Sequence, residues 1–329
     1  MLEHGGRLRA VAREQGIPLA DWLDLSTGIN PISWTPPSVP VSIWQRLPED
    51  EDGLEEAASS YYGCGNLLPV PGSQSAIQAL PQLRPRSVVG IINPIYQEHP
   101  QAWMNHGHEV LSFPVSQVDD YLRQLDVLVL CNPNNPDGRF ITKTTLLGWA
   151  NSLSEKGGWL IVDEAFMDTL PDAASVLDKA VYPGLIVLRS LGKFFGLAGA
   201  RVGFVMAEET LLIRLKALIG PWSVAGPSRW IACQALADKS WQKEMKVTLA
   251  RQAARLEQLL TRAGFSGHGN TGLFYYIESP DAEFIYRGFL KSAILVRHFP
   301  ALGAIRFGLP GPEEDWTRFE KALNNLEIR

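Results

Sequence analysis

Cysteine is scarce in this sequence: Cys64, Cys131 and Cys233 are the only three in 329 residues. They lie far apart and form no Cys-x-x-Cys pair, so the sequence offers neither a disulfide framework nor a thiolate metal site. Because free cysteines are typical of reducing compartments, we expect a cytoplasmic protein that holds no metal ion.

The sequence also lacks a basic excess and a long apolar segment. Lys and Arg number 30 against 35 Asp and Glu, which gives a net charge of −5, whereas a nucleic-acid partner requires clustered basic residues. No apolar run approaches the ~18 residues needed to span a bilayer. Residues 1–17 contain no apolar core of a signal peptide. We therefore expect neither a nucleic-acid partner nor membrane association.

Short apolar runs alternate with helix-like segments over the first two thirds of the chain. This alternation predicts α/β architecture with a mostly parallel sheet. The predicted strands are 87–92, 127–130, 159–163, 184–188 and 202–206. Helices are predicted over 75–83 and over 142–156, where Thr142 is a suitable N-cap.

The pattern changes near residue 208. A long amphipathic helix is predicted over 241–264, followed by three strand-like runs and a closing helix. We therefore expect a large domain over 36–207 and a smaller α+β domain built from 1–35 and 208–329. The proline-rich segment 30–44 is predicted to be ordered, because Trp34 and Trp44 give it surface to bury.

Polar residues follow the predicted strands at their carboxyl ends, where parallel sheets bind their ligands. Asn135 follows strand 127–130, Asp163 ends the next strand, and Ser190 and Lys193 follow the one after. Lys193 is flanked by leucine, glycine and two phenylalanines. Such a lysine either reaches water from a glycine-rich turn or serves covalent chemistry, for which partial burial is useful.

Other motifs also allow a structural and a functional interpretation. The loop 71–77 either caps a helix through Ser73 or offers backbone N–H groups to a phosphate. Tyr96 is either a core residue or a stacking surface just after a strand. Asp163 is either a strand end that meets solvent or a buried acid that needs a partner, such as a protonated ring nitrogen.

The order of these motifs is more specific than any one of them. A phosphate loop, an aromatic residue, Asn and Asp precede Ser-x-x-Lys, and an arginine follows eight residues beyond the lysine. This order resembles the fold-type I pyridoxal-phosphate enzymes of the class I and II aminotransferase group, over nearly the whole chain. The resemblance implies a mostly parallel seven-stranded sheet in the large domain, and pyridoxal 5′-phosphate as the cofactor.

The resemblance also implies a role for each residue. Lys193 corresponds to the lysine that joins the cofactor covalently, and Asp163 to the carboxylate that keeps the pyridine nitrogen protonated. Asn135 corresponds to the residue bonded to the ring hydroxyl, and Tyr96 to the ring stacked on the cofactor. The cofactor phosphate is expected to contact Ser73, Gln74, Ser190 and Arg201.

Two further positions bear on assembly and on departures from the family pattern. Tyr62 resembles the tyrosine that reaches the cofactor phosphate of the partner subunit, so we expect a homodimer with shared active sites. Phe166 is a departure, because many relatives carry at this position a tyrosine that also bonds the ring hydroxyl.

Two arginines near the end of the chain suggest a substrate with two anionic groups. Arg306 corresponds to the family arginine that binds the substrate carboxylate, although it also fits a strand at a domain edge. Arg297 lies on the neighbouring predicted strand. Because the two are close in the sequence, their roles are exchangeable.

Two N-terminal motifs narrow the substrate further. EHGG contains His4 and LSTGINP contains Asn30, and each could be no more than a surface segment or a turn. Together with the cofactor motifs they resemble the threonine-phosphate decarboxylases of cobalamin biosynthesis. This resemblance implies decarboxylation of L-threonine O-3-phosphate to (R)-1-amino-2-propanol phosphate. His4 and Arg297 then contact the phosphate, and Asn30 is a further substrate contact.

Two alternatives belong to other functional classes. An aminotransferase such as histidinol-phosphate aminotransferase would share the fold, the cofactor site and a phosphorylated substrate. A non-catalytic regulator built on the same fold would not need the cofactor lysine, and the presence of Lys193 therefore disfavours it.

Overall fold

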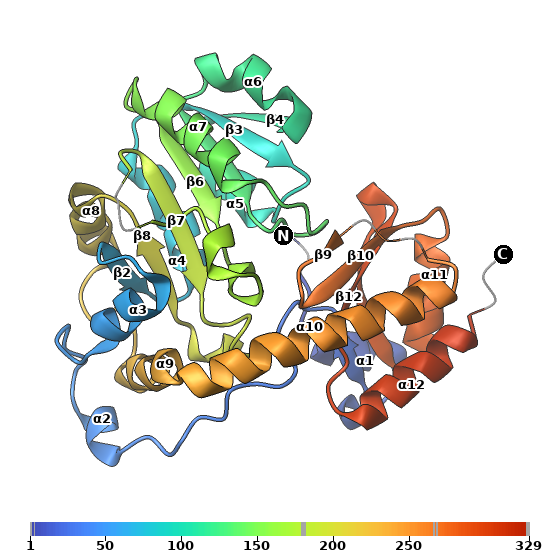
Figure 1. Cartoon of the computed structure of the whole chain (residues 1–329). Helices are drawn as coiled ribbons and strands as arrows, with labels where there is room; N and C mark the ends of the chain where they lie inside the picture. The colour runs from blue at the N-terminus through green and yellow to red at the C-terminus, as the bar shows by residue number, and fades with distance from the viewer. Residues whose placement is uncertain (1, 3, 179–181, 266, 268, 327–329) are drawn as a thin grey trace. The chain divides into compact units, whose positions relative to one another are not determined.

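The computed structural model describes residues 2, 4–178, 182–265, 267 and 269–326. The chain forms two compact units (Figure 1). The larger unit comprises Trp34–Asn135 and Phe140–Lys243, and the smaller unit comprises Met1–Ser33, Pro136–Arg139 and Glu244–Arg329. Within the described residues, none of the helices is long and apolar enough to cross a membrane.

A seven-stranded sheet forms the centre of the larger unit, with strand order β2-β8-β7-β6-β5-β3-β4. β8 runs antiparallel to both of its neighbours, and the other adjacent pairs are parallel, as the sequence predicts. The strands are β2 Leu67–Val70, β3 Val88–Asn93, β4 Glu109–Pro114, β5 Val127–Cys131, β6 Trp159–Asp163, β7 Leu185–Ser190 and β8 Gly203–Met206.

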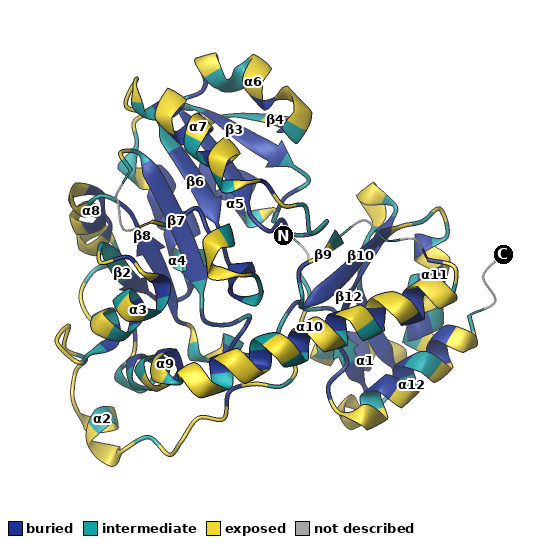
Figure 2. Ribbon diagram, viewed as in Figure 1, coloured by how far each residue is buried: buried dark blue, intermediate teal, exposed yellow. Residues whose placement is uncertain are grey.

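Helices cover both faces of this sheet, so its central strands are continuous apolar runs rather than alternating ones. Figure 2 shows β6 and β7 almost entirely buried. Side chains of α4, α5 and α8 share one core cluster with the sheet. The helices are α2 Val41–Gln45, α3 Leu54–Tyr62, α4 Ser73–Ala79, α5 Glu98–Asn105, α6 Val118–Tyr121, α7 Lys143–Ser154, α8 Glu209–Ile219 and α9 Gly226–Ala237.

Two helix predictions are confirmed. The predicted helix 142–156 is α7, and the Thr142 hydroxyl accepts a hydrogen bond from the Thr145 N–H at 3.3 Å, as an N-cap does. The predicted helix 75–83 is α4 followed by a 3₁₀ turn over Leu80–Leu83.

The smaller unit contains a five-stranded sheet with strand order β1-β11-β12-β10-β9. β1 pairs parallel with β11, so the N-terminal residues join this sheet as predicted. The strands are β1 Leu23–Leu25, β9 Gly269–Asn270, β10 Phe274–Glu278, β11 Ile294–Phe299 and β12 Ala304–Gly308. The helices are α1 Leu8–Gln15, α11 Ala282–Lys291 and α12 Glu313–Asn324, together with most of α10 Lys239–Arg262.

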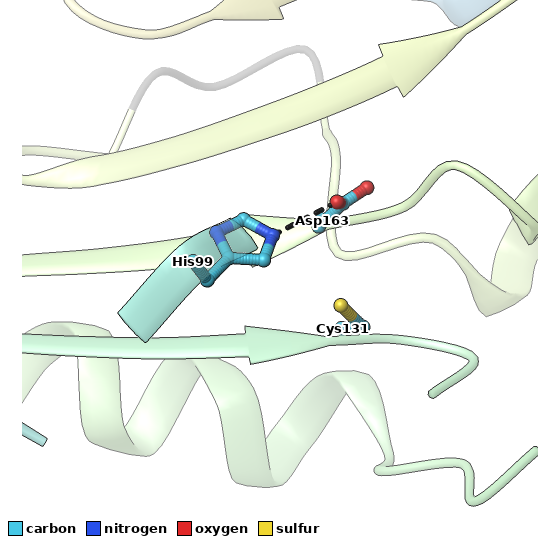
Figure 3. A group of neighbouring side chains, drawn as sticks. All are labelled: His99, Cys131 and Asp163. Atoms are coloured by element: carbon cyan, nitrogen blue, oxygen red, sulfur yellow. Dashed lines mark hydrogen bonds and ion pairs between the residues drawn. The ribbon is translucent and has the colours of Figure 1, made fainter. Parts of the chain in front are cut away.

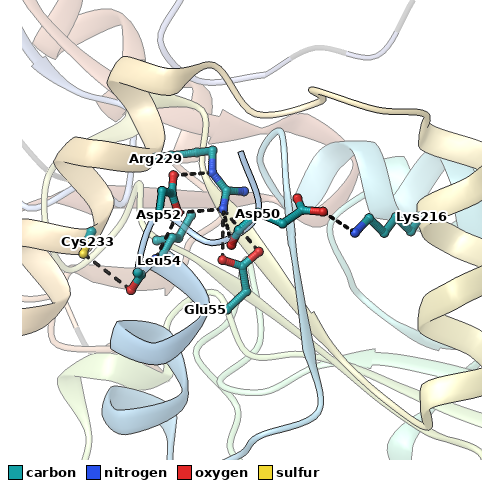
Figure 4. Close-up of polar contacts among 8 residues, drawn as sticks. Asp50, Asp52, Leu54, Glu55, Lys216, Arg229 and Cys233 are labelled. Atoms are coloured by element: carbon teal, nitrogen blue, oxygen red, sulfur yellow. Dashed lines mark hydrogen bonds and ion pairs between the residues drawn. The ribbon is translucent and has the colours of Figure 1, made fainter. Parts of the chain in front are cut away.

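The division between the units differs from the predicted boundary at residue 208. The helices α8 and α9 belong to the larger unit, and Pro136–Arg139 belongs to the smaller one. Figure 4 shows one reason: Arg229 of α9 pairs with Asp52 at 2.6 Å and with Glu55 of α3 at 2.9 Å. A helical pattern does not reveal such a pairing, because its partners lie about 175 residues earlier.

Of the two tryptophans predicted to be buried in segment 30–44, one is buried. Trp34 is buried, its backbone N–H donates to the Phe195 carbonyl, and its indole N–H donates to Asp238 at 3.0 Å. The prediction for Trp44 is wrong, because this side chain is 67% exposed. It lies on the short helix α2, near the equally exposed Val41 and Leu47.

Candidate active site

Asp163 ends β6 in the interior of the larger unit. Its Oδ1 accepts from the Ala165 N–H at 3.0 Å, and its Oδ2 lies 3.0 Å from Nε2 of His99 (Figure 3). A carboxylate can only accept, so Nε2 of His99 carries the proton in this pair. The acid is thus held at both oxygens, as a buried charge requires.

His99 was not predicted from the sequence. It lies three residues after Tyr96, about one helical turn away, in the motif NPIYQEH. Cys131 completes a group whose donor atoms lie within 4.8 Å of one another, and these atom types can also ligate a metal ion. The proton of His99 points at Asp163 instead, which suits a carboxylate positioned for a cationic partner.

Lys193 follows β7 by three residues and is half-buried. Its Nζ lies 5.3 Å from the centre of the Phe166 ring. The neighbouring Phe194 and Phe195 are fully buried and pack on Trp241. The aromatic residues beside the lysine therefore form core, and they fix the turn from which the amine projects.

An anion cradle forms where β7, β8 and the start of α4 meet. Ser190 pairs with Gly203 across β7 and β8. A Cβ at Gly203 would lie 2.5 Å from the Ser73 backbone nitrogen, and a Cβ at Gly72 would lie 2.7 Å from Arg201 Nη2. The two glycines therefore let the Arg201 guanidinium, Ser73 and Ser190 come together.

Arg201 itself adopts a left-handed backbone conformation, with φ of 55°. This conformation is uncommon for a residue other than glycine, and such strain is concentrated at functional sites. The guanidinium Nη1 donates to the Ala198 carbonyl at 3.2 Å, although the side chain is exposed. Arg201 is therefore an exposed cation with a fixed position.

Gln74 was predicted to contact the cofactor phosphate, but its side chain binds elsewhere. Its amide oxygen accepts from the Tyr96 hydroxyl at 3.2 Å, and its nitrogen donates to Glu98 at 2.7 Å. Burial, together with Glu98 and Asp163, raises the pKa of Tyr96, so this hydroxyl stays a donor. The Gln74 side chain thus orients the Tyr96 ring, and its predicted contact with the cofactor phosphate stays a prediction.

Asn135 lies in the loop after β5, and its side chain is half-buried. The other two asparagines of the motif hold the loop in place. Asn132 exchanges two hydrogen bonds with the Ile141 backbone, and the Asn134 amide donates to the Pro94 carbonyl at 2.7 Å. The motif NPNNPDG is thus a loop held in place by side-chain hydrogen bonds, rather than a simple turn.

Tyr62 lies in the core of the larger unit. Its side chain is buried, packs on Phe204, and lies with its ring 5.0 Å from the Arg189 guanidinium. Burial raises the pKa of its hydroxyl well above the usual value. The contact of Tyr62 with a partner subunit stays a prediction. The spacing of Leu54, Ala58 and Tyr62 on one face of α3 could have predicted this burial from the sequence.

In the smaller unit, Arg297 and Arg306 lie directly opposite each other on β11 and β12. Like charges in this position destabilise a sheet unless an anion lies between them. Arg306 is buried, with its guanidinium 4.7 Å from the Phe274 ring and 5.9 Å from the Phe299 ring. Burial and the charge of Arg297 lower the pKa of Arg306 to about 9. Both effects favour binding of an anion.

The N-terminal motifs meet this arginine pair through Ser26. The Gly6 N–H donates to Ser26 Oγ at 2.8 Å, and Arg306 Nη2 donates to the Ser26 carbonyl at 3.1 Å. Asn30 is buried, and its side-chain oxygen accepts from the Ile32 N–H, so it shapes its own turn. The segment that carries His4 and the side chain of Arg306 therefore both bond to Ser26.

A comparison with known proteins identifies the family. Residues 47–323 match the family model described as aminotransferase class I and II. The chain belongs to this family.

Two curated relatives match almost the whole chain. A threonine-phosphate decarboxylase of Pseudomonas aeruginosa is 48% identical over 98% of this chain and 97% of its own length. A protein of the same name from a Sinorhizobium species is 37% identical over 99% of this chain and 98% of its own length.

A solved structure shares the architecture of the chain. The histidinol-phosphate aminotransferase from Sinorhizobium meliloti, in complex with pyridoxal-5′-phosphate, superposes with a TM-score of 0.85. It is 20% identical and covers 99% of this chain and 96% of its own. At that identity the likeness establishes the fold, which is the fold-type I architecture that the sequence motifs predict.

Proposed function

We propose that the protein is a pyridoxal 5′-phosphate-dependent decarboxylase. It converts L-threonine O-3-phosphate to (R)-1-amino-2-propanol phosphate and CO2, a step in cobalamin biosynthesis. The opposed Arg297 and Arg306, joined through Ser26 to the segment that carries His4, are the main support from geometry. The near full-length similarity to threonine-phosphate decarboxylases supports the same substrate.

The larger unit fits pyridoxal phosphate on three separate observations. The Arg201 guanidinium over Gly72 leaves a cradle that suits the phosphate, and Ser73 and Ser190 border it. The buried Asp163 suits a protonated ring nitrogen. Lys193, on a fixed turn, supplies the amine for covalent attachment. When bound, the cofactor supplies an electron sink for the bond that breaks at the substrate α-carbon.

The residues of the chain do the rest of the chemistry. Asp163 holds a proton on the ring nitrogen, and His99 keeps the carboxylate in place. Tyr96, which Gln74 orients, would stack on the cofactor ring, and Asn135 would bond the ring hydroxyl. The amine of Lys193 would return a proton to the α-carbon of the substrate.

The smaller unit recognises the substrate by its two anionic groups. Arg306 binds the carboxylate, Arg297 and His4 bind the phosphate, and Asn30 lines the same site. A carboxylate beside Arg306 offsets both the burial of this guanidinium and its repulsion from Arg297. Two arginines at this spacing suit a substrate that carries a carboxylate and a phosphate.

We also propose that the protein is a cytoplasmic homodimer with shared active sites. Val41, Trp44 and Leu47 are 62–70% exposed on and beside α2, and large apolar side chains gathered in this way favour burial against another chain. Light scattering of the Trp44→Glu variant tests this surface. We expect a dimer for the wild type and a monomer for the variant, and a variant that remains dimeric would exclude this surface.

The decisive experiment for the activity uses the purified protein, pyridoxal phosphate and L-threonine O-3-phosphate, with no keto acid. Release of CO2 together with aminopropanol phosphate would establish the decarboxylase, because decarboxylation needs no amino acceptor. No CO2, but amino transfer from histidinol phosphate to 2-oxoglutarate, would establish the aminotransferase instead. The fold and the cofactor site would then stand, and the reaction assignment would be wrong.

A further inference from the structure

Ser26 lies in line with the two arginines across the smaller sheet. It follows Leu25, which pairs with Val296 of β11, the residue before Arg297. Arg306 is on the far side of β11, and its Nη2 reaches across that strand to donate to the Ser26 carbonyl at 3.1 Å. The backbone of Ser26 therefore sets where the Arg306 guanidinium lies.

The side chain of Ser26 holds a second segment. Its hydroxyl donates to Asp24 Oδ1 at 2.6 Å and accepts from the Gly6 N–H at 2.8 Å. The Ser26 N–H also donates to Asp24 Oδ1, at 2.9 Å. Ser26 is 1% exposed, so these bonds are shielded from water. The Asp24 bonds are a local turn, but the Gly6 bond spans 20 residues of sequence.

Two glycines let these backbones approach each other. A Cβ at Gly5 would collide with the Ser26 carbonyl oxygen, and a Cβ at Gly308 would collide with the Thr27 carbonyl oxygen. The segment 4–6 therefore lies directly on one side of Ser26, and β12 lies on the side of Thr27. This packing gives a structural reason for the glycine pair after His4.

We propose that Asp24 and Ser26 form a clamp that positions the His4–Gly6 segment beside Arg306 and thereby sets the recognition of the substrate phosphate. The inference rests on the proposed function, because it concerns the same substrate. Asp24 and Ser26 are positioning residues: they hold the groups that contact the substrate. The cofactor residues lie in the other unit, so the clamp acts on substrate binding and leaves cofactor binding unchanged.

The first test is the Ser26→Ala variant of the holoenzyme. We expect the KM for L-threonine O-3-phosphate to rise about tenfold, with a much smaller change in kcat, because a shielded hydrogen bond to a charged network is lost. Inorganic phosphate, as a competitive inhibitor, should weaken by a similar factor. The dissociation constant of pyridoxal phosphate should stay at the wild-type value.

A matched pair at Asp24 separates the hydrogen bonds from the charge. Asp24→Asn keeps the oxygen that accepts from Ser26 and should retain a near-wild-type KM, whereas Asp24→Ala should raise the KM as Ser26→Ala does. The Gly5→Ala variant disrupts the clamp without altering Asp24 or Ser26. Its Cβ displaces the segment from Ser26, and the KM should rise again with little change in kcat.

The outcomes distinguish this inference from the proposed function. If the wild-type protein does not turn over L-threonine O-3-phosphate, the proposed function is wrong. The inference about the clamp, which concerns this substrate, is then wrong as well. If the wild type is active but the three disruptive variants keep its KM and its phosphate inhibition, the clamp is refuted. A parallel loss of cofactor affinity, kcat and melting temperature in all three would also overturn it, because that result indicates a merely structural role.

Discussion

The buried charged residues of the two units have different kinds of neighbours. In the larger unit, Asp163 pairs with His99, and Arg189 pairs with Glu164 at 3.3 Å and with Asp168 at 3.1 Å. In the smaller unit, Arg306 faces a second cation, Arg297, and donates to a neutral carbonyl. The larger unit therefore gives each of these buried groups a hydrogen-bonding or oppositely charged partner, whereas the smaller unit brings two arginines opposite each other on neighbouring strands.

The largest effect should come from Lys193, which separates covalent chemistry from binding. Lys193→Ala should lower the decarboxylation rate by at least about 10³-fold, because both the attachment of the cofactor and the proton donor are lost. Borohydride reduction followed by mass spectrometry checks the attachment. The wild type should retain the cofactor on Lys193 and the variant should not, and equal labelling of both would identify a different lysine.

The second effect tests the arginine pair of the smaller unit. Arg306→Gln should raise the KM by about 10- to 100-fold, since a charged contact to the substrate is removed. Because burial and Arg297 lower the pKa of Arg306 to about 9, we expect kcat/KM of the wild type to fall above that pH.

The charge of Arg297 is a cause of the lowered pKa of Arg306, which offers a control for this profile. Arg297→Gln should move the alkaline fall in kcat/KM to higher pH, because repulsion of the Arg306 cation is relieved. Arg306→Gln should lose that fall. A profile that is identical in all three proteins would show that the fall belongs to the substrate amine or to another group.

The smallest effect tests the pair formed by His99 and Asp163 in the larger unit. His99→Leu removes the donor to Asp163 and should weaken pyridoxal phosphate binding by about tenfold, while His99→Gln keeps an N–H donor and should restore most of it. The ¹⁵N chemical shift of the labelled ring nitrogen reports its proton directly. If both variants match the wild type in affinity and shift, His99 does not position Asp163.

The sequence predicted the elements that depend on local patterns. The buried run 127–130 became β5, Thr142 caps α7, and the order of the motifs along the chain predicted the family that the comparison shows. Each of these signals lies within a few residues: an apolar run, a cap, or a polar residue after a strand.

The misses share a different cause. The partner of His99 lies 64 residues away, and the partners of Arg229 lie about 175 residues away. Tyr62 turned inward because α3 buries its face, and Trp44 stayed exposed because α2 covers no core of its own. Local patterns do not specify such positions, since they depend on which elements become neighbours.

By itself, the sequence determined the fold class and the cofactor, because strand periodicity and motif order are properties of the chain. Only the tertiary structure decided that Arg297 and Arg306 lie in register and that Ser26 joins the N-terminal segment to Arg306. Strand register and long-range hydrogen bonds depend on pairing between distant segments. A shift of one residue in β11 would have turned Arg297 to the other face of the sheet.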